Sequence, residues 1–600
     1  MDKATGSGIK GSIVASVGRL QGMSPLWLVV IITIAAFLPV CRYAFVDWDD
    51  PLHVYQNPYL NPITASHLIH FWRTPYEGLY VPVSYMAFAL LVSIARGSNA
   101  MPTPSGGLSH LDPHVFHIAN LVLHLANVIL VFDILRTVLR DNRSAAVGSL
   151  LFGIHPIQVE AVAWISELRG LLATLLALLA IREFLKYVMD ERKIGRRVDW
   201  HSVIAIVLYG VGLLAKPSII PVPLIALLLG WLAVRRDVQR GAWVIAAWSI
   251  IIIPCILLAR SAQPTTGDFV VPFWQRPFVA GDALAFYMGK ILWPIGLGED
   301  YGRTPTVVLG HVQTYLIWLI PLIVSVAAWR LRDRCPSIVV AWSLFVIGLL
   351  PNLGFAPFIF QRFSTVADRY AYLAMLGPAL FGAWALHYCA GRFRPFSVAA
   401  VSLTVFAAAF SLTVVQRGYW RNSFALFEHS LAVNPFSSTM HYDMGIALAR
   451  TGRADQAVRE YREAIRLDPS SAKAHCNLAA LLSSQQDTNG AIAEFRECLS
   501  IDPNVAAAHY GLALLLGTQG RLSAASEQWS ETIRLWPASA TAHYNMGVTL
   551  YQTGNLKAAA NQLHIAIALD PTEVQARQAL QYVLAKQKRS AANQQAINQG

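Results

Sequence analysis

Long apolar runs alternate with short basic clusters over the first two thirds of the chain. Runs long enough to cross a bilayer lie at about 25–41, 114–135, 145–160, 168–188, 201–216, 218–234, 242–259, 312–329, 337–354, 370–389 and 396–415. Arginine and lysine clusters between such runs are typical of cytoplasmic loops. The pattern predicts an all-α, multi-pass membrane domain over residues 25–417, after a cytoplasmic tail at 1–24.

The last third has a different pattern, a strict internal repeat. Prolines recur every 34 residues, at Pro435, Pro469, Pro503, Pro537 and Pro571. Small residues recur at the eighth position of each repeat, alanine at the twentieth and a large residue at the twenty-fourth. This is the period of the tetratricopeptide repeat (TPR), a pair of antiparallel helices that stacks into a solenoid. The repeat predicts a degenerate repeat or linker at 418–437, four repeats over 438–571, a capping helix at 572–586 and a disordered tail at 587–600.

The basic clusters also predict the orientation of the chain in the membrane. Eleven spans that start from a cytoplasmic N-terminus place every cluster in the cytoplasm. The odd number of spans then puts the repeats on the extracytoplasmic side. This arrangement requires the apolar segments 81–96 and 280–297 to lie along the outer surface. If either segment spans, every later loop changes sides.

Composition narrows the class of partner and the compartment. Hydrophobic residues make up 55% of the chain and charged residues 14%, and the net charge of +12 lies in clusters between apolar runs, so nucleic acid is not an expected partner. The six cysteines form no CxxC pair, and we expect neither a disulfide framework nor a metal motif. A compact chain without long low-complexity insertions favours a bacterial inner membrane with periplasmic repeats; the alternative is an endoplasmic reticulum membrane with lumenal repeats.

The predicted topology gathers ionisable residues at the outer ends of separate spans, which is typical of a functional site. These residues are Asp49, Asp50, His155, Glu160, Arg169, Lys216, Asp368, Arg369 and Tyr370. Crowded carboxylates beside an apolar span can act as a general base or bind a divalent cation, but they are also typical of a solvated loop.

Each of the other residues has a structural alternative as well. His155 precedes Pro156 and is equally suited to capping the local backbone. Arg169 is suited to a phosphate or to pairing with a neighbouring glutamate. Lys216 is suited to the membrane interface, and the Asp368–Arg369 pair is typical of a helix start.

Five motifs, in order, resemble the transmembrane and tetratricopeptide-repeat O-mannosyltransferases. They are Phe45-Val46 with Asp49-Asp50 and Asn57-Pro58, the segment Phe116–His124, His155-Pro156 with Glu160-Ala161-Val162, Lys216-Pro217, and Ala367-Asp368-Arg369-Tyr370 with Tyr372-Leu373. The repeats follow directly, so the resemblance covers nearly the whole chain. Segment 97–113, with its prolines and glycines, departs from the family pattern as an expanded loop.

The resemblance implies a GT-C type glycosyltransferase fold and a polyprenyl-phosphate sugar as donor substrate. It implies that Asp49 or Asp50 is the general base, with Asp49 favoured, and that Glu160 positions the acceptor or the sugar. Arg169, Lys216 and Arg369 become candidates for the lipid phosphate, and His155, Asp368 and Tyr370 for substrate binding. A divalent cation at Asp49 and Asp50 is the one cofactor these residues allow.

The repeats are expected to recruit a protein acceptor. Asp443, Asn477 and Asn545 share the sixth position of their repeats, on the face that usually lines the concave groove, and ordinary helix polarity is the alternative. His441, His475, His509 and His543 share the fourth position, where core packing is favoured over zinc because stacked repeats lie roughly 10 Å apart. Three other functions stay open: a non-catalytic scaffold for envelope assembly, a ligase for lipid-linked oligosaccharides and, more distantly, a transporter.

Overall fold

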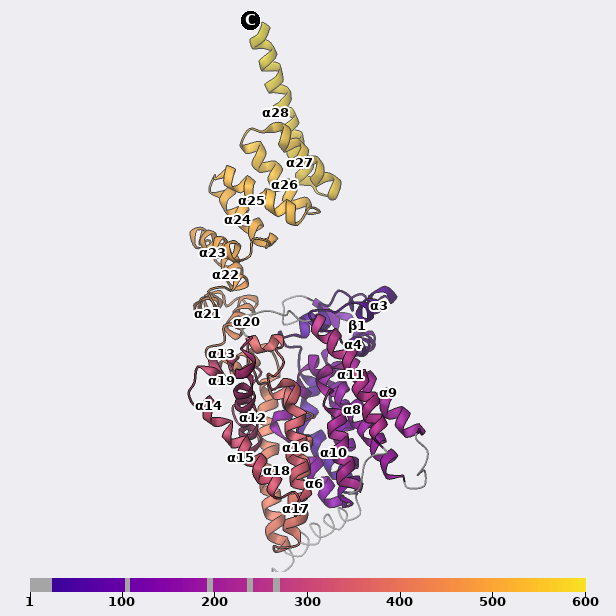
Figure 1. Cartoon of the computed structure of the whole chain (residues 1–600). Coiled ribbons are helices and arrows are strands. Elements are labelled where there is room, and N and C mark those ends of the chain that lie inside the picture. Colours follow the sequence, from indigo (N-terminus) through magenta and orange to yellow (C-terminus); the bar gives the residue numbers. More distant parts are fainter. Residues whose placement is uncertain (1–23, 103–107, 191–197, 235–240, 263–269, 600) are drawn as a thin grey trace, which may run out of the picture. The chain divides into compact units, whose positions relative to one another are not determined.

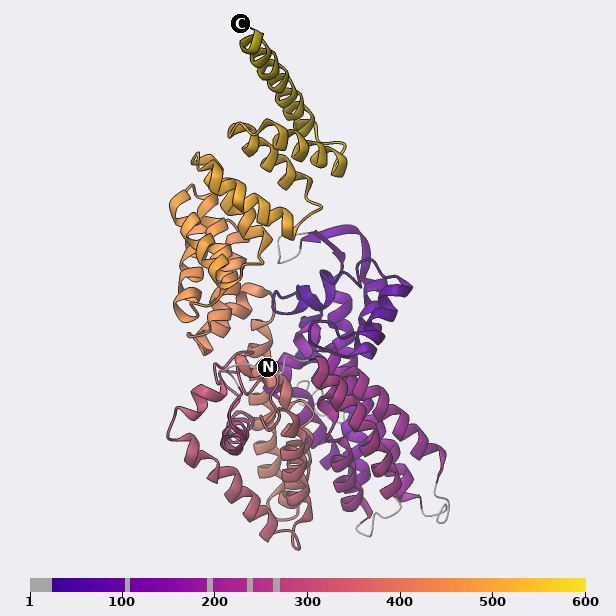
Figure 2. The same cartoon turned by 45° about the horizontal axis from the view of Figure 1, so that its top comes forward.

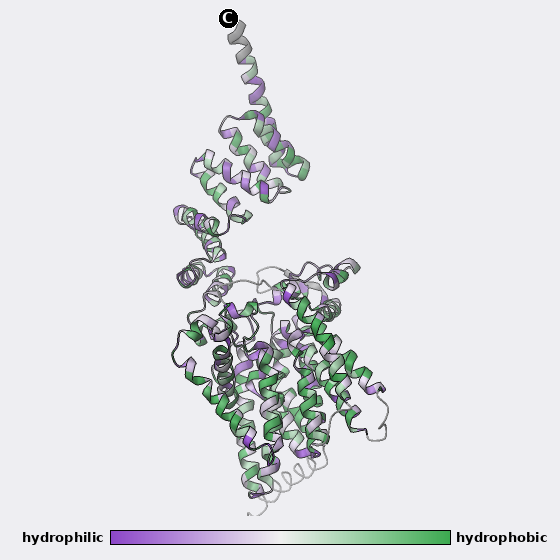
Figure 3. Cartoon of the chain, viewed as in Figure 1, coloured by the Kyte–Doolittle hydropathy of each residue, from purple (hydrophilic) through white to green (hydrophobic). Residues whose placement is uncertain are grey.

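A computed structural model describes residues 24–102, 108–190, 198–234, 241–262 and 270–599 of the chain. It divides into two compact units, residues 1–435 and 436–600, and each is described by itself. The predicted cytoplasmic tail at 1–24 lies outside the described residues except for its last position. The chain is almost wholly helical, as the sequence predicts, and Figure 3 shows that apolar residues dominate the helices of the first unit.

The first unit consists of helices of very different lengths. They are α2 (Pro25–Phe37), α3 (Ala65–Arg73), α4 (Pro82–Ala95), α5 (Pro113–Leu139), α6 (Asn142–Ile154), α7 (Val159–Ala163), α8 (Leu168–Met189), α9 (Trp200–Ala215), α10 (Val222–Val234), α11 (Ala242–Ala262), α12 (Arg276–Leu292), α13 (Pro305–Leu309), α14 (Thr314–Ile317), α15 (Leu319–Arg330), α16 (Pro336–Leu349), α17 (Leu376–Ala390), α18 (Pro395–Tyr419) and α19 (Ser423–Val433). Helix α10 packs against α8 and also against α16 (Figures 1 and 2).

Five helices among the described residues are long and apolar enough to cross a membrane, and a sixth span arises if one bent pair counts. The number is smaller than the eleven predicted runs. Several runs form shorter helices, such as Trp200–Ala215 and Pro336–Asn352, and α8 carries charged residues in its second half. The protein is therefore a multi-pass membrane protein.

The run predicted as a single span at 145–160 is broken in the structure. Helix α6 ends at Ile154, and after His155 the chain turns by 52° into the segment Pro156–Ala163. Pro156 lacks the backbone N–H that would continue the helix, which explains the position of the break. The short helices η3 (Pro156–Gln158), α7 and η4 (Ile165–Glu167) then carry the chain to α8.

Segment 97–113, expected as an expanded loop, begins as a hairpin. Strand β1 (Arg96–Pro102) pairs antiparallel with β2 (Leu108–Leu111), with Arg96 opposite Leu111. The residues between the strands lie outside the described part of the chain.

The second unit is a series of antiparallel helix pairs, as the 34-residue period predicts. The pairs are α20 (Ser438–Arg450) with α21 (Ala454–Leu467), α22 (Ala472–Ser484) with α23 (Thr488–Ile501), α24 (Ala506–Thr518) with α25 (Leu522–Leu535), and α26 (Ala540–Gln552) with α27 (Leu556–Leu569). A Cβ added to Gly445 would lie 2.7 Å from the Tyr461 ring, so the small eighth residue lets the two helices of a repeat approach closely.

Two features of the repeats differ from the prediction. Helix α28 runs Val574–Gln599, so it continues through the region expected to be a disordered tail from 587. Cys476 and Cys498 form a disulfide bond between α22 and α23, although the cysteine spacing indicated no disulfide framework. The other cysteines, Cys41, Cys255, Cys335 and Cys389, are free.

The repeated histidines pack within their repeats, as expected. His475, His509 and His543 are buried, and each contacts a side chain nineteen residues later through Nδ1. Their Nε2 atoms meet the carbonyl oxygens of the repeat prolines Pro469, Pro503 and Pro537. These contacts give the fourth position a structural role.

Candidate functional site

A stripe of buried polar residues on α5 supports the broken segment that carries much of the site. Asn120 Nδ2 donates to the carbonyl oxygens of Val162, at 3.3 Å, and Trp164, at 2.9 Å. His124 Nε2 meets the carbonyl oxygen of Gly153 at 2.9 Å. Helix breaks leave carbonyl groups without intrahelical partners, and a membrane domain must satisfy them internally. The α5 stripe therefore holds the segment that presents Glu160, Glu167 and Arg169.

The same stripe continues one turn further along α5. Asn127 Nδ2 donates to the carbonyl oxygen of Leu171 at 3.1 Å and to the Tyr372 hydroxyl at 3.2 Å. The His124 Nδ1 atom lies 2.7 Å from that hydroxyl. Residues 116–124 were singled out as a family-like motif without a role; the structure gives this motif and the residues just after it a supporting role beneath the site.

Asp49 and Asp50, adjacent in sequence, have different surroundings. Asp50 is buried and accepts three hydrogen bonds: from Val46 N at 3.1 Å, from Ser166 N at 3.1 Å and from Ser166 Oγ at 2.7 Å. The Asp49 carboxylate is half-buried and accepts no hydrogen bond from any residue in the described part of the chain. Asp50 thus joins the segment that follows α2 to η4, while the Asp49 carboxylate has no such hydrogen bonds from the described residues.

The charges of two arginines act on the Asp49 carboxylate. Burial raises the pKa of Asp49, whereas the charges of Arg169 and Arg369 oppose this rise. Burial also raises the pKa of Asp50 to about 7, against the hydrogen bonds from Ser166 and Val46. A carboxylate that accepts no hydrogen bond from the described residues, and on which two guanidinium charges act, is a candidate general base.

The three cationic candidates are each held by a named partner. Lys216 Nζ donates to both carboxylate oxygens of Glu167 at 2.7 Å. Arg369 donates through Nη1 and, at 2.9 Å, through its backbone N–H to Glu160. The guanidinium of Arg369 also lies over the Phe360 ring, 4.2 Å from its centroid. Glu160 therefore positions a cation.

Arg169 does not pair with Glu160 or Glu167, the partners considered from sequence. Its Nε donates to the Ser166 carbonyl oxygen at 2.9 Å, and its Nη1 to His53 Nε2 at 3.2 Å. Burial alone would raise the pKa of Glu167, but Lys216, Arg169 and Arg369 hold it below its ordinary value. The positive groups thus act on Glu167 together.

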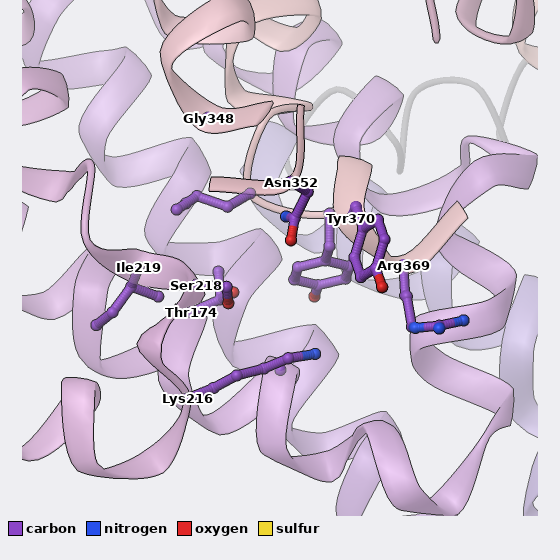
Figure 4. A pocket seen from close by; sticks show the side chains of 11 residues that line it. Thr174, Lys216, Ser218, Ile219, Gly348, Asn352, Arg369 and Tyr370 are labelled. Carbon is purple, nitrogen blue, oxygen red and sulfur yellow. The ribbon is translucent and has the colours of Figure 1, made fainter. Parts of the chain in front are cut away.

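A small pocket, with a cavity volume of about 30 Å³, lies between α8, the segment 216–219, the end of α16 and residues 369–373. Its lining includes Lys216, Arg369 and Tyr370, which the sequence singled out, and Thr174, Ser218 and Asn352, which it missed. Figure 4 shows the ammonium of Lys216 and the amide of Asn352 extending into the same space. Asp49 is not among the lining residues. A pocket lined by two cations and by hydroxyl and amide groups suits an anionic ligand.

His155 and Asp368 are candidates that the structure places outside this pocket lining. His155 is buried; its Nδ1 accepts from Ile157 N at 3.2 Å and its Nε2 lies 3.1 Å from the Ile291 carbonyl oxygen, so it caps local backbone. Asp368 accepts from the Tyr301 hydroxyl at 2.7 Å. Burial and Glu160 raise the pKa of Asp368 well above its ordinary value. Their predicted role in substrate binding stays untested.

Three residues near the site had no signal in the sequence analysis. The sequence around Tyr85 and around His53 is typical of an ordinary hydrophobic core. Glu299 is fully buried, and neither of its carboxylate oxygens has a partner among the described residues. Burial raises the pKa of Glu299 well above its ordinary value.

The residues proposed for an acceptor groove lie in the second unit. Asp443, Asn477 and Asn545 are half-buried at the same position of their repeats. Asn477 Nδ2 donates to the Tyr442 hydroxyl at 3.2 Å. The positions are equivalent, as predicted, and their role in binding stays a prediction.

The fold and the site together define a multi-pass, all-α membrane protein with a TPR solenoid. Three family models, described as "TPR repeat" and "Tetratricopeptide repeat", match residues 445–486, 472–505 and 510–574. The solved structure of YrrB, described as a TPR protein with an unusual peptide-binding site, overlaps 26% of this chain and 81% of its own, with 22% identity and a TM-score of 0.25.

Curated proteins give the second step of the identification. Protein O-mannosyl-transferase F38B6.6 of Caenorhabditis elegans is 23% identical over an alignment of 474 residues. The alignment covers 75% of this chain and 63% of that protein. Protein O-mannosyl-transferase TMTC4 of Mus musculus is 25% identical over an alignment of 520 residues. That alignment covers 73% of this chain and 66% of that protein. The match thus spans less than two thirds of either relative. The chain is a relative of proteins named protein O-mannosyl-transferases, which confirms the resemblance found in its motifs.

Proposed function

We propose that the chain is a membrane glycosyltransferase that moves a sugar from a polyprenyl-phosphate carrier to a hydroxyl group of a protein. The names of its relatives favour mannose as the sugar. The observation that carries the proposal is the available Asp49 carboxylate beside Arg169 and Arg369. The adjoining cationic pocket supports it.

The proposed reaction assigns a separate task to each group. The acceptor oxygen attacks the anomeric carbon, the bond from that carbon to the phosphate oxygen breaks, and Asp49 takes the hydroxyl proton. The released polyprenyl phosphate keeps the bonding electrons. Lys216 and Arg369 stabilise its negative charge, because fixed cations in a site shielded from water interact strongly with developing anions. Attack opposite the leaving group inverts the sugar carbon.

The repeats would recruit the protein acceptor. Asp443, Asn477 and Asn545 present side chains that can hydrogen-bond a peptide backbone at regular spacing. Replacing all three with alanine should raise KM for a folded protein acceptor and leave kcat for a short hydroxyl-bearing peptide unchanged. An unchanged KM for the protein would remove the groove from the proposal.

We place the site and the repeats on the extracytoplasmic side, in a bacterial inner membrane. The disulfide between Cys476 and Cys498 supports this side, because disulfides persist in oxidising compartments. Labelling of single introduced cysteines with a membrane-impermeant reagent in intact cells tests the orientation.

The divalent cation considered at Asp49 and Asp50 stays a prediction. In the part of the chain that the structure describes, no group of three or more His, Cys, Asp or Glu side chains is placed to hold a metal ion. Removal of metal with EDTA, followed by addition of Mg²⁺ or Mn²⁺, tests whether transfer needs one.

A transfer assay tests the central proposal. Purified full-length protein would receive radiolabelled polyprenyl-phosphate mannose with envelope proteins or hydroxyl-bearing peptides as acceptor. We expect label on protein with the wild type and at least a hundredfold less with Asp49→Asn, since a general base typically contributes about 10²–10⁴-fold. Equal transfer by the two proteins would contradict the role of Asp49.

A further inference from the structure

His53 lies one turn after Asp49 and contacts two other elements. Its backbone N–H donates to the Asp49 carbonyl oxygen at 3.0 Å within the helical turn η2 (Pro51–Tyr55) and the residues before it. The imidazole is buried between Tyr85 of α4 and Arg169 of α8. Its Nδ1 is 3.0 Å from the Tyr85 hydroxyl and its Nε2 is 3.2 Å from Arg169 Nη1.

The donor inventory fixes the protonation of this ring. Arginine has only donors and stays protonated in proteins, so His53 Nε2 must accept the hydrogen bond from Arg169. A ring that accepts at Nε2 is neutral and carries its proton on Nδ1. That N–H faces the Tyr85 hydroxyl, which accepts it. Tyr85 thereby stabilises the tautomer that leaves an acceptor for Arg169.

Two fixed bonds then orient the guanidinium of Arg169. Its Nε donates to the Ser166 carbonyl oxygen and its Nη1 to His53, so the plane of the group is set from two sides. Arg169 is buried, and its charge is the strongest of the groups that favour the ionised form of Asp49. Removal of either bond would let the long side chain choose other rotamers.

We propose that His53 is a positioning residue that, held as its neutral Nδ1–H tautomer by Tyr85, fixes the guanidinium of Arg169 between His53 and Ser166, from where its charge acts on Asp49. The inference rests on the proposed function, because it assigns His53 a task in preparing the base. It accounts for a buried histidine that touches no pocket-lining residue in its hydrogen bonds. It also explains why an arginine beside two glutamates pairs with neither.

Several charged or titratable groups act on this pair from the neighbouring elements. The charged groups that act on Asp49 are Glu167 of η4, Arg169 of α8, Arg369 of η11 (Asp368–Ala371) and the adjacent Asp50. Tyr85 of α4 also interacts with Asp49. His53 interacts with Arg169, and burial together with that charge lowers the pKa of His53 well below its ordinary value. The hydrogen bond from Arg169 and this lowered pKa both favour the neutral ring.

A titration that needs no catalysis tests the inference. In full-length Asp49→Cys protein, the rate of iodoacetamide alkylation at position 49, followed against pH by peptide mass spectrometry, reports the pKa of the introduced thiol. A nearby cation lowers a thiol pKa as it does that of a carboxylate. We expect His53→Leu to raise this midpoint by about half a pH unit or more, because an opposite charge within a few ångströms typically shifts a pKa by about 1–3 units.

Conservative and control variants separate positioning from general damage. His53→Gln keeps an acceptor where Nε2 stood, so it should return the midpoint close to that of the parent. Tyr85→Phe should produce a smaller rise than His53→Leu, because the favourable tautomer is then no longer selected. His70→Leu is the control: His70 lies in α3, stacks on Tyr59, and its ring nitrogens contact the Thr74 hydroxyl. It should leave the midpoint unchanged.

The outcomes distinguish this inference from the proposed function. An unchanged midpoint in His53→Leu, or equal rises in His53→Leu and His53→Gln, would overturn the positioning role, even if the protein transfers sugar. In the native Asp49 background, the acidic limb of the transfer rate should move in the same direction as the thiol midpoint. A thiol that responds as expected in a protein that transfers no sugar would support the positioning and refute the proposed function.

Discussion

Replacement of Asp49 and of Asp50 by alanine should have opposite consequences for stability and for transfer. Asp49→Ala removes a carboxylate that accepts no hydrogen bond from the described residues. Its free energy of unfolding should therefore stay within about 0.5 kcal/mol of the wild type. Transfer should fall by about 10²–10⁴-fold if Asp49 is the base.

Asp50→Ala removes the acceptor of three buried donors. The N–H of Val46 and the N–H and hydroxyl of Ser166 lose their partner. A buried donor without a partner costs about 1–3 kcal/mol, so three of them cost roughly 3 kcal/mol or more. Asp50→Asn keeps one oxygen for both Ser166 donors and loses the bond from Val46, so its loss should be about 1–3 kcal/mol.

Equilibrium unfolding in mixed detergent micelles measures these free energies, and the transfer assay on the folded fraction measures activity. The two aspartates are adjacent, so each is the matched control for the other. Similar destabilisation by Asp49→Ala and Asp50→Ala would show that the hydrogen bonds to Asp50 do not hold the loop. Full transfer by Asp49→Ala would refute its role as base.

The pH dependence of stability follows from the same carboxyl group. Burial raises the pKa of Asp50 from 3.8 to about 7. Between these values the folded chain binds a proton that the unfolded chain has released, so the free energy of unfolding should fall as pH rises from about 4 to about 7. Asp50→Asn should lack this component. If the free energy of unfolding of the wild type instead rises over this pH range relative to that of Asp50→Asn, the raised pKa of Asp50 is contradicted.

Three further substitutions test the packing and the pocket. Lys216→Met should destabilise the protein by about 3–5 kcal/mol because it removes the ammonium that donates to both carboxylate oxygens of buried Glu167; adding Glu167→Gln should restore stability but not transfer, and restored transfer would remove Lys216 from the phosphate site. Replacing both Cys476 and Cys498 with serine opens a 22-residue loop and should cost about 3 kcal/mol in denaturant unfolding of the repeats; an unchanged midpoint would show that the bond adds no stability. Gly377→Ala places a Cβ 2.4 Å from a backbone oxygen of α16 and should cost about 1–3 kcal/mol in thermal unfolding, whereas Gly418→Ala, with no neighbour within 4 Å, should not.

The solenoid was predictable because each of its features repeats. Proline at every thirty-fourth position and a small residue at the eighth position of each repeat are satisfied together by one architecture. The packing of Gly445 against Tyr461 shows the physical reason. The Cys476–Cys498 bond was missed because a spacing of 22 has no motif. Placing the two cysteines at the fifth and twenty-seventh positions of one repeat, on facing helices, would have found it.

The members of the site were predictable, but not their pairing. Hydropathy and loop charge brought Glu160, Arg169, Lys216 and Arg369 to one side of the membrane. No sequence signal could tell which cation would meet which carboxylate, because several arrangements have the same composition. The break after His155 was hidden for a related reason, since an apolar run reads as one span whether or not Pro156 bends it.

The polar stripe of α5 has a consequence for how the chain enters the membrane. Its groups find their partners in carbonyl oxygens that belong to residues synthesised later, from Gly153 to Leu171. When synthesis has reached only the end of α5, none of these partners is available to Asn120, His124 and Asn127. Polar groups without partners in hydrocarbon are costly. Stable membrane insertion of α5 therefore depends on residues that are synthesised after it. A nascent chain that ends soon after Leu139 should stay at the insertion machinery, and α5 should enter the lipid only when the broken segment has been synthesised.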